Sequence, residues 1–494
     1  MRSHAKLGLS KSLLLKGIQC PKALYLAKFP PPLEIPTKPE LEARFRAGHE
    51  VGTLAQELFP GGTEVPFKGL SFGEQIKRTQ RLIGSGVNAI YEASFGFDGI
   101  FVKVDILARD GVAWQIHEVK MGTSVKDVNL DDVAIQYYVL TNCGLKISKV
   151  FLVHINTAYE RHGPIDVRQL FASDEVTDDA RLRQNLLPQQ VSQLRRTLRG
   201  GEPNIDIGPY CLNPYECDYI PYCWQHIPEN SIFDLRGNGV NKFELYKRGI
   251  VRLQDVPADE LNANQHEQLV ATLNKRDSVN HQAVDEFLQT LWYPICFLDF
   301  ETFSYPIPLF DNCRPYQQIP FQYSMHVRYS ENSKLEHYNY LAPPSIDPRR
   351  ELTETLLNVV PEGACVLTYN QAFEKNVLKT LADLYPDLSV TINNLLLNVR
   401  DLMVPFRRRD IYCWQMRGSY SIKEVLPAMV PDMSYDGLQV ADGAAAMQAY
   451  LDMRLLKPGV ELSCLRQAML DYCRLDTLAM VKILDKIKGF ARNT

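Results

Sequence analysis

Short apolar runs alternate with helical patterns in two separate stretches of the chain, and this alternation restricts the fold more than any other feature. The strand-like runs are residues 101–108, 113–119, 150–154, 295–300 and 366–369. Helical patterns occupy 131–140, between two of the earlier runs, and 462–490, after the later ones. Strands with interposed helices are typical of α/β folds. The sequence therefore predicts a multidomain α/β protein.

Length and composition fit a chain of several globular domains. Its 494 residues correspond to two to four domains of roughly 100–200 residues each. Hydrophobic residues make up 45% and charged residues 23%, the balance of an ordinary globular protein. We expect three domains, at 1–224, 225–293 and 294–494. The middle one reads as a helical connector, either a plain spacer or elements like the helix-hairpin-helix units that touch DNA.

The charge balance excludes a uniformly basic nucleic-acid coat protein. Net charge is −4 and the isoelectric point is about 6.2, with local arginine groups at 195–199 and 407–409. Each arginine group alone is more typical of a solvated face than of a binding patch. No apolar run approaches the roughly 20 residues of a membrane span, and the first twelve residues lack a signal-peptide pattern. We therefore expect a cytoplasmic protein with no membrane partner.

The first group of acids is Asp105 with the motif Glu118-Val119-Lys120. Two carboxylates hold a hard cation such as Mg²⁺ or Mn²⁺, which activates water and polarises a phosphate. A lysine on the same face positions the water or stabilises developing charge. The pattern suits metal-assisted phosphodiester hydrolysis, although a bare Asp…Glu-x-Lys is also common in surface hairpins.

A turn signal, Asp110-Gly111, lies between the two runs that carry these acids. With the turn at those residues, Asp105 lies opposite Ile116, and Glu118 becomes its diagonal neighbour on the same face. Diagonal neighbours across two strands are roughly 7–8 Å apart, so both carboxylates can reach one cation. The sequence thus predicts a hairpin that brings the two acids together.

The second group of acids comes from distant parts of the chain. Asp299 and Glu301 are two residues apart at the end of a strand-like run, so both side chains leave the same face. Tyr472 and Asp476 are four residues apart on a helical pattern and also share a face. Glu374 lies between them, where a strand leads into a helix. Several acids from separate elements are what a two-metal site requires, whereas Asp-x-Glu alone is common among unrelated acids.

Around the first acids, further residues resemble the RecB-like nucleases of the PD-(D/E)xK superfamily, in particular their iron–sulfur-bearing branch. The matching residues are Cys20-Pro21-Lys22, Asp105, Glu118-Val119-Lys120, Gln136, Cys211, Cys217 and Cys223. The resemblance covers about residues 10–224 and implies Asp105 and Glu118 as metal ligands. It also implies Lys120 as the catalytic lysine and Gln136 as a helix residue beside the site.

The first domain departs from that family on its early helix. Many members carry a histidine ligand there, and Gly52 or Gln56 stands at the equivalent position of this chain. His49, one or two turns away, is the remaining candidate for a third metal ligand.

Four cysteines are expected to share a cofactor. Cys211, Cys217 and Cys223 repeat at even spacing, and Cys20 is the distant fourth that the resemblance implies. Iron–sulfur clusters need several thiolates that converge on one point, whereas zinc sites favour closer pairs such as C-x₂₋₄-C. We therefore expect a 4Fe-4S cluster, with zinc or no metal as the alternatives. The other cysteines are expected to be reduced, most of them in the core.

The later motifs follow an ordered pattern: Asp-x-Glu after an apolar strand, Asn-x₂-Phe-acid, then Tyr-x₃-Asp on a late helix. This order resembles the DnaQ-like 3′–5′ exonucleases of the DEDD class, tyrosine subtype, and implies an RNase H-like fold over about residues 294–491. The implied roles are metal ligation by Asp299, Glu301 and Asp476, a fourth acid at Glu374, and water orientation by Tyr472. Glu374 stands where the family has aspartate, and Asp401 is a spare acid.

The leading hypothesis is a metal-dependent nuclease that hydrolyses phosphodiester bonds in DNA, single-stranded DNA first of all. The C-terminal domain would trim 3′ ends, and the N-terminal domain would cut at a second site. Two alternatives stay open: one active domain beside a decayed partner, and a non-catalytic DNA-binding module for repair or defence. RNA also stays open as a substrate, because this chemistry does not need to distinguish the sugar.

Overall fold

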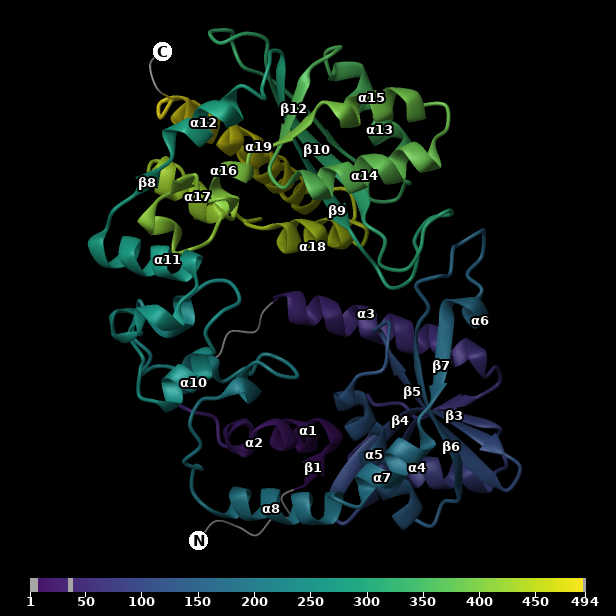
Figure 1. Cartoon of the computed structure of the whole chain (residues 1–494). Helices are drawn as coiled ribbons and strands as arrows, with labels where there is room; N and C mark the ends of the chain where they lie inside the picture. Colours follow the sequence, from purple (N-terminus) through teal and green to yellow (C-terminus); the bar gives the residue numbers. More distant parts are fainter. Residues whose placement is uncertain (1–7, 34–38, 492–494) are drawn as a thin grey trace. The chain divides into compact units, whose positions relative to one another are not determined.

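The structure, a computed structural model, describes residues 8–33 and 39–491, with the side chains of all of these except 39–41. The chain forms two compact units (Figure 1). Unit 1 comprises Met1–His226 and Tyr305–Tyr316, and unit 2 comprises Ile227–Ser304 and Gln317–Thr494. The expected connector therefore packs within the same unit as the C-terminal residues. A short segment of the expected C-terminal domain packs instead with the N-terminal one.

Unit 1 contains a mixed sheet and nine helices within the described residues. Its strands are β1 (Leu9–Ser10), β2 (Thr63–Glu64), β3 (Ala89–Phe97), β4 (Ile100–Asp110), β5 (Ala113–Lys120), β6 (Ile147–Ile155) and β7 (Phe171–Glu175). Its helices are α1 (Lys11–Gln19), α2 (Pro21–Lys28), α3 (Pro39–Ala55), α4 (Phe72–Gly84), α5 (Asp127–Asn142), α6 (Val167–Leu170), α7 (Thr177–Gln184), α8 (Leu187–Arg199) and α9 (Ile220–Cys223).

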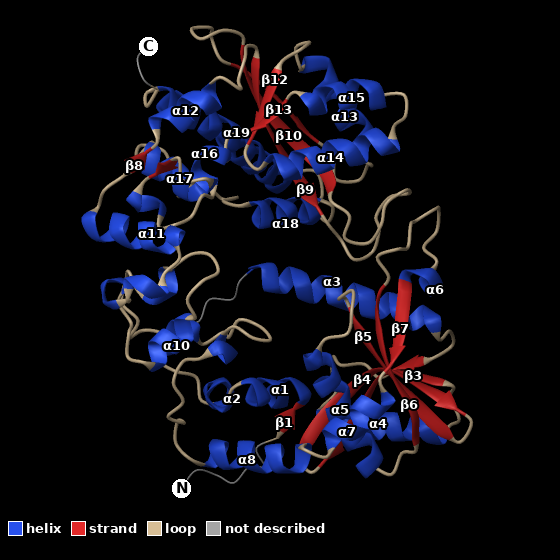
Figure 2. Ribbon diagram, in the orientation of Figure 1, coloured by secondary structure: helices blue, strands red, loops and turns tan. Residues whose placement is uncertain are grey.

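The sheet of unit 1 has the strand order β2-β3-β4-β5-β6-β7, and β1 pairs with β4 (Figure 2). Strands β3, β4 and β5 form an antiparallel meander, and β6 pairs with β5 in parallel after the crossover through α5. One face carries the larger hydrophobic core, which buries Leu14 of α1, Val133 of α5 and Leu194 of α8. The opposite face buries Val51 of α3.

The hairpin between β4 and β5 turns one residue later than the sequence predicted. Asp110 is still paired in the ladder, so the two turn residues are Gly111 and Val112. Gly111 has φ +59° at the first turn position, as a type II′ turn requires. The predicted register was therefore wrong: the last pair is Ile106 with His117, and the next positions, Asp105 and Glu118, follow directly opposite each other rather than diagonally.

Unit 2 contains a second mixed sheet, a two-stranded sheet and ten helices within the described residues. Its strands are β8 (Ser278–Val279), β9 (Ile295–Phe303), β10 (Ile319–Arg328), β11 (Glu336–Leu341), β12 (Cys365–Thr368), β13 (Val399–Asp401) and β14 (Ile411–Tyr412). Its helices are α10 (Lys242–Lys247), α11 (Ala263–Asn274), α12 (His281–Leu288), α13 (Arg349–Val359), α14 (Gln371–Leu384), α15 (Ser389–Leu397), α16 (Val404–Arg407), α17 (Ile422–Met429), α18 (Gly443–Met453) and α19 (Val460–Lys488).

The main sheet of unit 2 has the strand order β11-β10-β9-β12-β13 (Figure 2). Strand β10 runs antiparallel to β9 and β11, whereas β12 and β13 run parallel to β9. The chain leaves β9 toward one edge and returns through α13 to its other side, so the strand order reverses between β9 and β12. Open α/β sheets bind their ligands beyond the carboxyl ends of the strands at such a switch point.

Successive side chains of β9 point to opposite faces of the sheet. Cys296, Leu298 and Phe300 are buried in the hydrophobic core with residues of α13, α14 and α15. Asp299 and Glu301 alternate with them and therefore point to the opposite face, where α18 and α19 contact the strand. The fold thus turns the side chains of the two acids toward α19, the helix that carries the expected tyrosine and aspartate.

The predicted α/β class is confirmed, and each expected element is present, with bounds that differ by up to four residues. The strand-like runs correspond to β4, β5, β6, β9 and β12, and the two helical patterns correspond to α5 and α19. Over the described ranges, no helix combines the length and the apolarity that crossing a membrane would demand.

Candidate functional site

The end of β9 carries a group of acids that we call the β9 cluster, namely Asp299, Glu301, Glu374 and Asp476, with Tyr472 beside them. Strand β9 supplies two of the carboxyls, the first turn of α14 supplies one, and α19 supplies the fourth together with the tyrosine. The structure thus brings together all five residues of this group that the sequence predicted.

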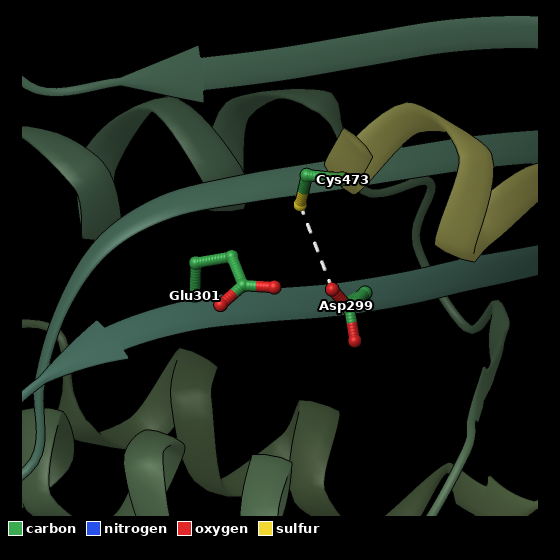
Figure 3. Close-up of side chains that lie close together, drawn as sticks. All are labelled: Asp299, Glu301 and Cys473. Carbon is green, nitrogen blue, oxygen red and sulfur yellow. Dashed lines mark hydrogen bonds between the residues drawn. The ribbon is translucent and has the colours of Figure 1, made fainter. Parts of the chain in front are cut away.

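A cysteine that the sequence did not predict contacts the cluster (Figure 3). One ligand atom each of Asp299, Glu301 and Cys473 lies within 4.8 Å of the other two. The Cys473 thiol of α19 donates to Oδ2 of Asp299 at 3.5 Å. A cysteine inside an apolar helical pattern indicates only a core residue, so the one available signal was its position next to Tyr472.

Helix α19 holds Asp476 and Tyr472 on one side, as their four-residue spacing predicted. The hydroxyl of Tyr435 donates to Oδ1 of Asp476 at 2.6 Å. The ring centroids of Tyr435 and Tyr472 are 6.2 Å apart. Two tyrosine rings therefore close this side of the cluster.

Glu374 is buried in the first turn of α14, and its Oε2 has no hydrogen-bond partner among the described residues. The spare acid, Asp401, is buried at the end of β13. Its Oδ1 accepts from the backbone N–H groups of Asn370 and Met403, each at 3.0 Å. Asp401 therefore fixes the backbone just before α14, a structural role.

Burial raises the pKa of every carboxyl in the β9 cluster. Repulsion from Asp476 adds to this effect at Asp299, and repulsion from both of them adds to it at Glu301. The pKa of Asp476 rises to about 6 through burial, although hydrogen bonds from the two tyrosines oppose the rise. Lys423 of α17 is the cation that acts against these shifts. Among the described residues, this lysine acts on Glu301 and Asp476 but not on Asp299 or Glu374, a deficit of positive charge that a divalent cation would fill.

A second group, the β5 cluster, forms in unit 1 from Lys11, Asp105, Glu118, Lys120, Asp132 and Gln136. Glu118 of β5 is its centre. Oε1 of Glu118 accepts from Lys11 at 2.8 Å and from Lys120 at 2.6 Å, and Oε2 accepts from Gln136 at 2.7 Å. The predicted residues of the first acid group are thus brought together, apart from the expected histidine.

Two members of the β5 cluster, Lys11 and Asp132, were not predicted as site residues. Asp132 pairs with Lys120 at 2.6 Å and with Lys11 at 2.8 Å, and it accepts from Gln136 at 3.2 Å. Asp132 lies one helical turn before Gln136, so the spacing on α5 was a usable signal. Lys11 comes from α1, and only tertiary packing brings it to the acids.

Asp105 lies where β4 and β5 part, and its Oδ2 accepts from the backbone N–H of Val119 at 2.7 Å. On the neighbouring strand, Glu92 has φ +55° and pairs with Lys103 at 2.6 Å. Left-handed backbone at a non-glycine residue persists only where its surroundings impose it, often at functional sites. Burial raises the pKa of Asp105, and the charge of Glu92 raises it further.

The β5 cluster neutralises most of its own charge. Burial raises the pKa of Glu118 to about 7. Burial alone would also raise the pKa of Asp132, but Lys11 and Lys120 hold that pKa far below its usual range. Three carboxyls face two lysines here, whereas Lys423 acts on only two of the four carboxyls in the β9 cluster.

His49, the expected third metal ligand, is exposed on α3. Within the described part of the chain, its ring has no hydrogen bond or ion pair to the β5 cluster. Helix α3 packs against the sheet through Val51 and Ala55, which are buried. Residues two positions apart on a helix do not share a face, so His49 points away from the side that Val51 presents to the core.

The four cysteines line one cavity at the edge of unit 1. Cys20 precedes α2, Cys223 ends α9, and Cys211 and Cys217 lie in the segment before it. All four are free thiols, and no three of their sulfur atoms lie within 4.8 Å of one another. Burial, with a smaller effect of the other three thiols, raises the pKa of Cys223 to about 11 against the opposing charge of Lys22. The four thiols therefore share the lining of one cavity.

Comparison with known proteins gives one family match. A family model described as a domain of unknown function (DUF2779) matches residues 296–421. No match was found among curated proteins. The matched range runs from β9 to the residue before α17, so it contains Asp299, Glu301 and Glu374 and ends before Tyr472 and Asp476.

Proposed function

We propose that the chain is a metal-dependent nuclease whose principal active site is the β9 cluster. The observation that carries the proposal is the gathering of four carboxyls from β9, α14 and α19, all with raised pKa values, of which Lys423 acts on Glu301 and Asp476 alone among the described residues. Buried carboxyls are costly unless cations pair with them, and carboxylate oxygens are the ligands that Mg²⁺ and Mn²⁺ take. The buried negative charge of the cluster favours cation binding and lowers the stability of the chain when no cation is bound.

The proposed roles follow from where each side chain lies. Asp299, Glu301 and Asp476 would hold the divalent cations, with Glu374 as the fourth acid. When bound, the cations supply a polarised phosphate and an activated water. Burial and the neighbouring carboxylates raise the pKa of Tyr472, so its hydroxyl stays protonated and can orient that water.

Cys473 takes part as a hydrogen-bond donor rather than as a metal ligand. Burial and the three nearby carboxylates of Asp299, Glu301 and Asp476 raise the pKa of its thiol far above the usual range. A neutral thiol is a poor ligand for a hard cation such as Mg²⁺. Its contact to Asp299 instead fixes the orientation of that carboxyl.

The fold of unit 2 supports a relationship to the DnaQ-like exonucleases. The strand that carries Asp-x-Glu is central in a mixed five-stranded sheet, and the late helix with Tyr-x₃-Asp contacts it. This arrangement agrees with the RNase H-like fold that the motif order implies. We therefore assign to unit 2 the removal of nucleotides from 3′ ends of single-stranded DNA, with RNA as the alternative substrate.

The β5 cluster supports a second nuclease site of the RecB-like type. Lys120 contacts both Glu118 and Asp132, the position expected of a catalytic lysine beside metal ligands. One observation favours the alternative in which unit 2 alone is active. Lys11 pairs with the same two carboxyls, so a cation must displace it before binding.

The four-cysteine cavity fits a 4Fe-4S cluster better than zinc. Tetrahedral zinc with Zn–S bonds of about 2.3 Å would place the sulfur atoms about 3.8 Å apart. No three of the sulfur atoms lie even within 4.8 Å of one another, a spread that suits a larger guest. Cys20 would join such a cluster to the segment that ends in Cys223, a structural role.

The test is a nuclease assay on the full chain with 5′- or 3′-labelled DNA and RNA oligonucleotides in Mn²⁺. We expect 5′-labelled single strands to shorten in single-nucleotide steps, which reports removal from the 3′ end. Asp299→Asn with Glu301→Gln should slow this by at least about 10³-fold, because the metal contributes several kcal/mol. Glu118→Gln with Lys120→Ala should leave it intact. Trimming that survives the first pair would refute the assignment.

A further inference from the structure

Unit 2 contains a half-open cavity of about 680 Å³ whose lining includes none of the acids of the β9 cluster. We name it the arginine cavity, because Arg236, Arg407 and Arg409 contribute to its lining. No acidic residue is among the described residues that line it. Its volume lies in the range of about 300–1,000 Å³ that is usual for ligand pockets. In a chain of net charge −4, such a lining is a local concentration of positive charge.

The wall of the arginine cavity is fixed by contacts across unit 2. Oε1 of Gln268 on α11 accepts from the backbone N–H of Arg236 at 3.0 Å, and its Nε2 donates to the carbonyl of Arg417 at 3.1 Å. Gly418 has φ +76°, and a Cβ there would lie 2.5 Å from Gln268. This close approach requires glycine, so the connector and the loop before α17 form one built surface.

Two of the three guanidinium groups are available to an anion. Arg236 is exposed, and its side chain has no hydrogen bond or ion pair within the described ranges. Arg407 forms a long ion pair with Asp401 at 3.9 Å, which is beyond hydrogen-bond distance and leaves its N–H groups able to donate to an anion. Arg409 is instead paired with Glu267 at 3.2 Å. Guanidinium groups with unused N–H donors favour phosphate, which they bind with two parallel hydrogen bonds.

The lining also offers aromatic rings and free donors. Tyr369 donates from its hydroxyl to the carbonyl of Tyr420 at 2.8 Å, and the side chain of Tyr420 is exposed. Ser421 stands at the N-cap of α17 but makes no capping hydrogen bond with its side chain. Arginines with interleaved tyrosines are the composition of single-strand binding sites, where bases stack on the rings and cations follow the backbone.

The arginine cavity adjoins the β9 cluster. Tyr369 and Asn370 line the cavity and lead directly into α14, whose first turn carries Glu374 into the cluster. Tyr369 also lies within electrostatic range of Tyr435, which donates to Asp476. A strand with its 3′ end at the acids would therefore have its preceding nucleotides beside this cavity.

We propose that the arginine cavity binds the phosphates and bases of one or two nucleotides of single-stranded nucleic acid. The connector takes part through Arg236 and is a component of the substrate path rather than a spacer. The direction in which the strand enters rests on the proposed function. Binding in the cavity does not, because binding needs neither metal nor cleavage.

The test measures binding of the full chain to a fluorescent ten-nucleotide oligo(dT) in EDTA, by anisotropy over a range of salt concentrations. Arg236→Ala with Arg407→Ala should weaken binding about tenfold and reduce the salt slope by about 0.7 for each phosphate that the variant no longer neutralises. Matched controls are Arg252→Ala on the connector and Arg408→Ala beside Arg407. Both controls are exposed and outside the cavity, so they should leave affinity and slope unchanged.

The outcomes separate the two proposals. A decrease in affinity equal to that of the controls would overturn the assignment of the cavity. Competition by dTMP or inorganic phosphate at the concentration of the oligonucleotide would overturn it as well and indicate a free-nucleotide site. A selective decrease in affinity without any cleavage activity would support the cavity and refute the nuclease. Normal trimming with no selective decrease in affinity would refute the cavity alone.

A positional readout keeps the proposal falsifiable if the arginine variants fold poorly. Oligonucleotides with 5-iodouracil near the 3′ end, irradiated on the unmodified chain, should crosslink to the peptide that contains Tyr420. Mass spectrometry identifies the peptide. Crosslinks confined to peptides of unit 1 would contradict the proposal.

Discussion

The raised pKa values of the carboxyls in the β9 cluster make the folding stability of the metal-free chain depend on pH. Burial raises the pKa of Asp299 and Glu301 well above the usual range and that of Asp476 to about 6. A carboxyl whose folded pKa exceeds its unfolded value of about 4 binds more protons in the folded state. Stability should therefore fall as pH rises from about 4 through about 6. Divalent cations should restore it above that range.

Replacing Asp299 by asparagine removes a charge that the fold disfavours. We expect Asp299→Asn to raise the unfolding temperature of the metal-free chain by about 2–4 °C at pH 8 and to have no effect at pH 4. Thermal melts in EDTA at the two pH values measure this, with the exposed Glu362→Gln as a control. A variant less stable than the parent at pH 8 would show that the charge of Asp299 is satisfied in the folded chain.

Lys11 competes with metal for the acids of the β5 cluster. Because it pairs with Glu118 and Asp132 at 2.8 Å each, Lys11→Met should raise the Mn²⁺ affinity of this cluster about tenfold, which corresponds to about 1.4 kcal/mol. Calorimetric titration in an Asp299→Asn background with Glu301→Gln isolates the cluster. Lys28→Met serves as the control. Unchanged affinity would show that Lys11 does not obstruct the metal.

At the scale of elements, the spacing of apolar residues predicted the strands and helices. An element that buries one face must repeat apolar residues at its own structural period. It could not fix the hairpin register, since glycine can occupy the second position of one turn type or the first of another. Asp132 was within reach of the sequence, one turn before Gln136. Lys11 was not, because only the docking of α1 against α5 brings it to the acids. Cys473 was not predicted either, because only the docking of α19 against β9 brings its thiol to Asp299.

The segment that carries Cys217 is hydrogen-bonded to α1, which is distant from it in the sequence. Gln19 at the end of α1 donates to the carbonyls of Tyr210 and Tyr215, each at 2.8 Å, next to the cysteine-lined cavity. Cys217→Ser should abolish bound iron and sulfide and the brown colour, and it should lower the unfolding temperature. The exposed Cys143→Ser is the control. Stoichiometric zinc in a colourless parent protein would contradict the cluster.

At the scale of the whole molecule, the two units do not follow the order of the sequence. The segment Tyr305–Tyr316 continues from β9 yet belongs to unit 1. Ile307 and Tyr316 pack there against the core that includes Val51, and Arg161 donates to the carbonyls of Pro308 and Leu309 at 3.0 and 2.9 Å. No local sequence pattern predicts the contact of Arg161 with this segment, because it joins residues that are about 150 positions apart.

A fragment that ends at residue 226 should therefore be less stable than unit 1 in the full chain. It lacks the apolar cover of Ile307 and Tyr316, which is worth about 1.5–3 kcal/mol for each large side chain if fully buried. Hydrogen exchange of β6 and α3 in both proteins measures the difference. The same fragment with residues 305–316 attached by a flexible linker is the control. Equal protection in the short fragment would show that the segment is dispensable.

The most direct test of the central claim is a metal switch at the cleaved phosphate. Sulfur in place of a non-bridging oxygen is a poor ligand for Mg²⁺ and a better one for the softer Mn²⁺. The assay uses a variant with Glu118→Gln and Lys120→Ala, so that only the β9 cluster can act, on a strand with sulfur at its last linkage. Trimming should slow by at least about tenfold in Mg²⁺ and recover in Mn²⁺. Equal sulfur effects in both metals, or trimming in EDTA, would contradict metal-dependent hydrolysis at this cluster.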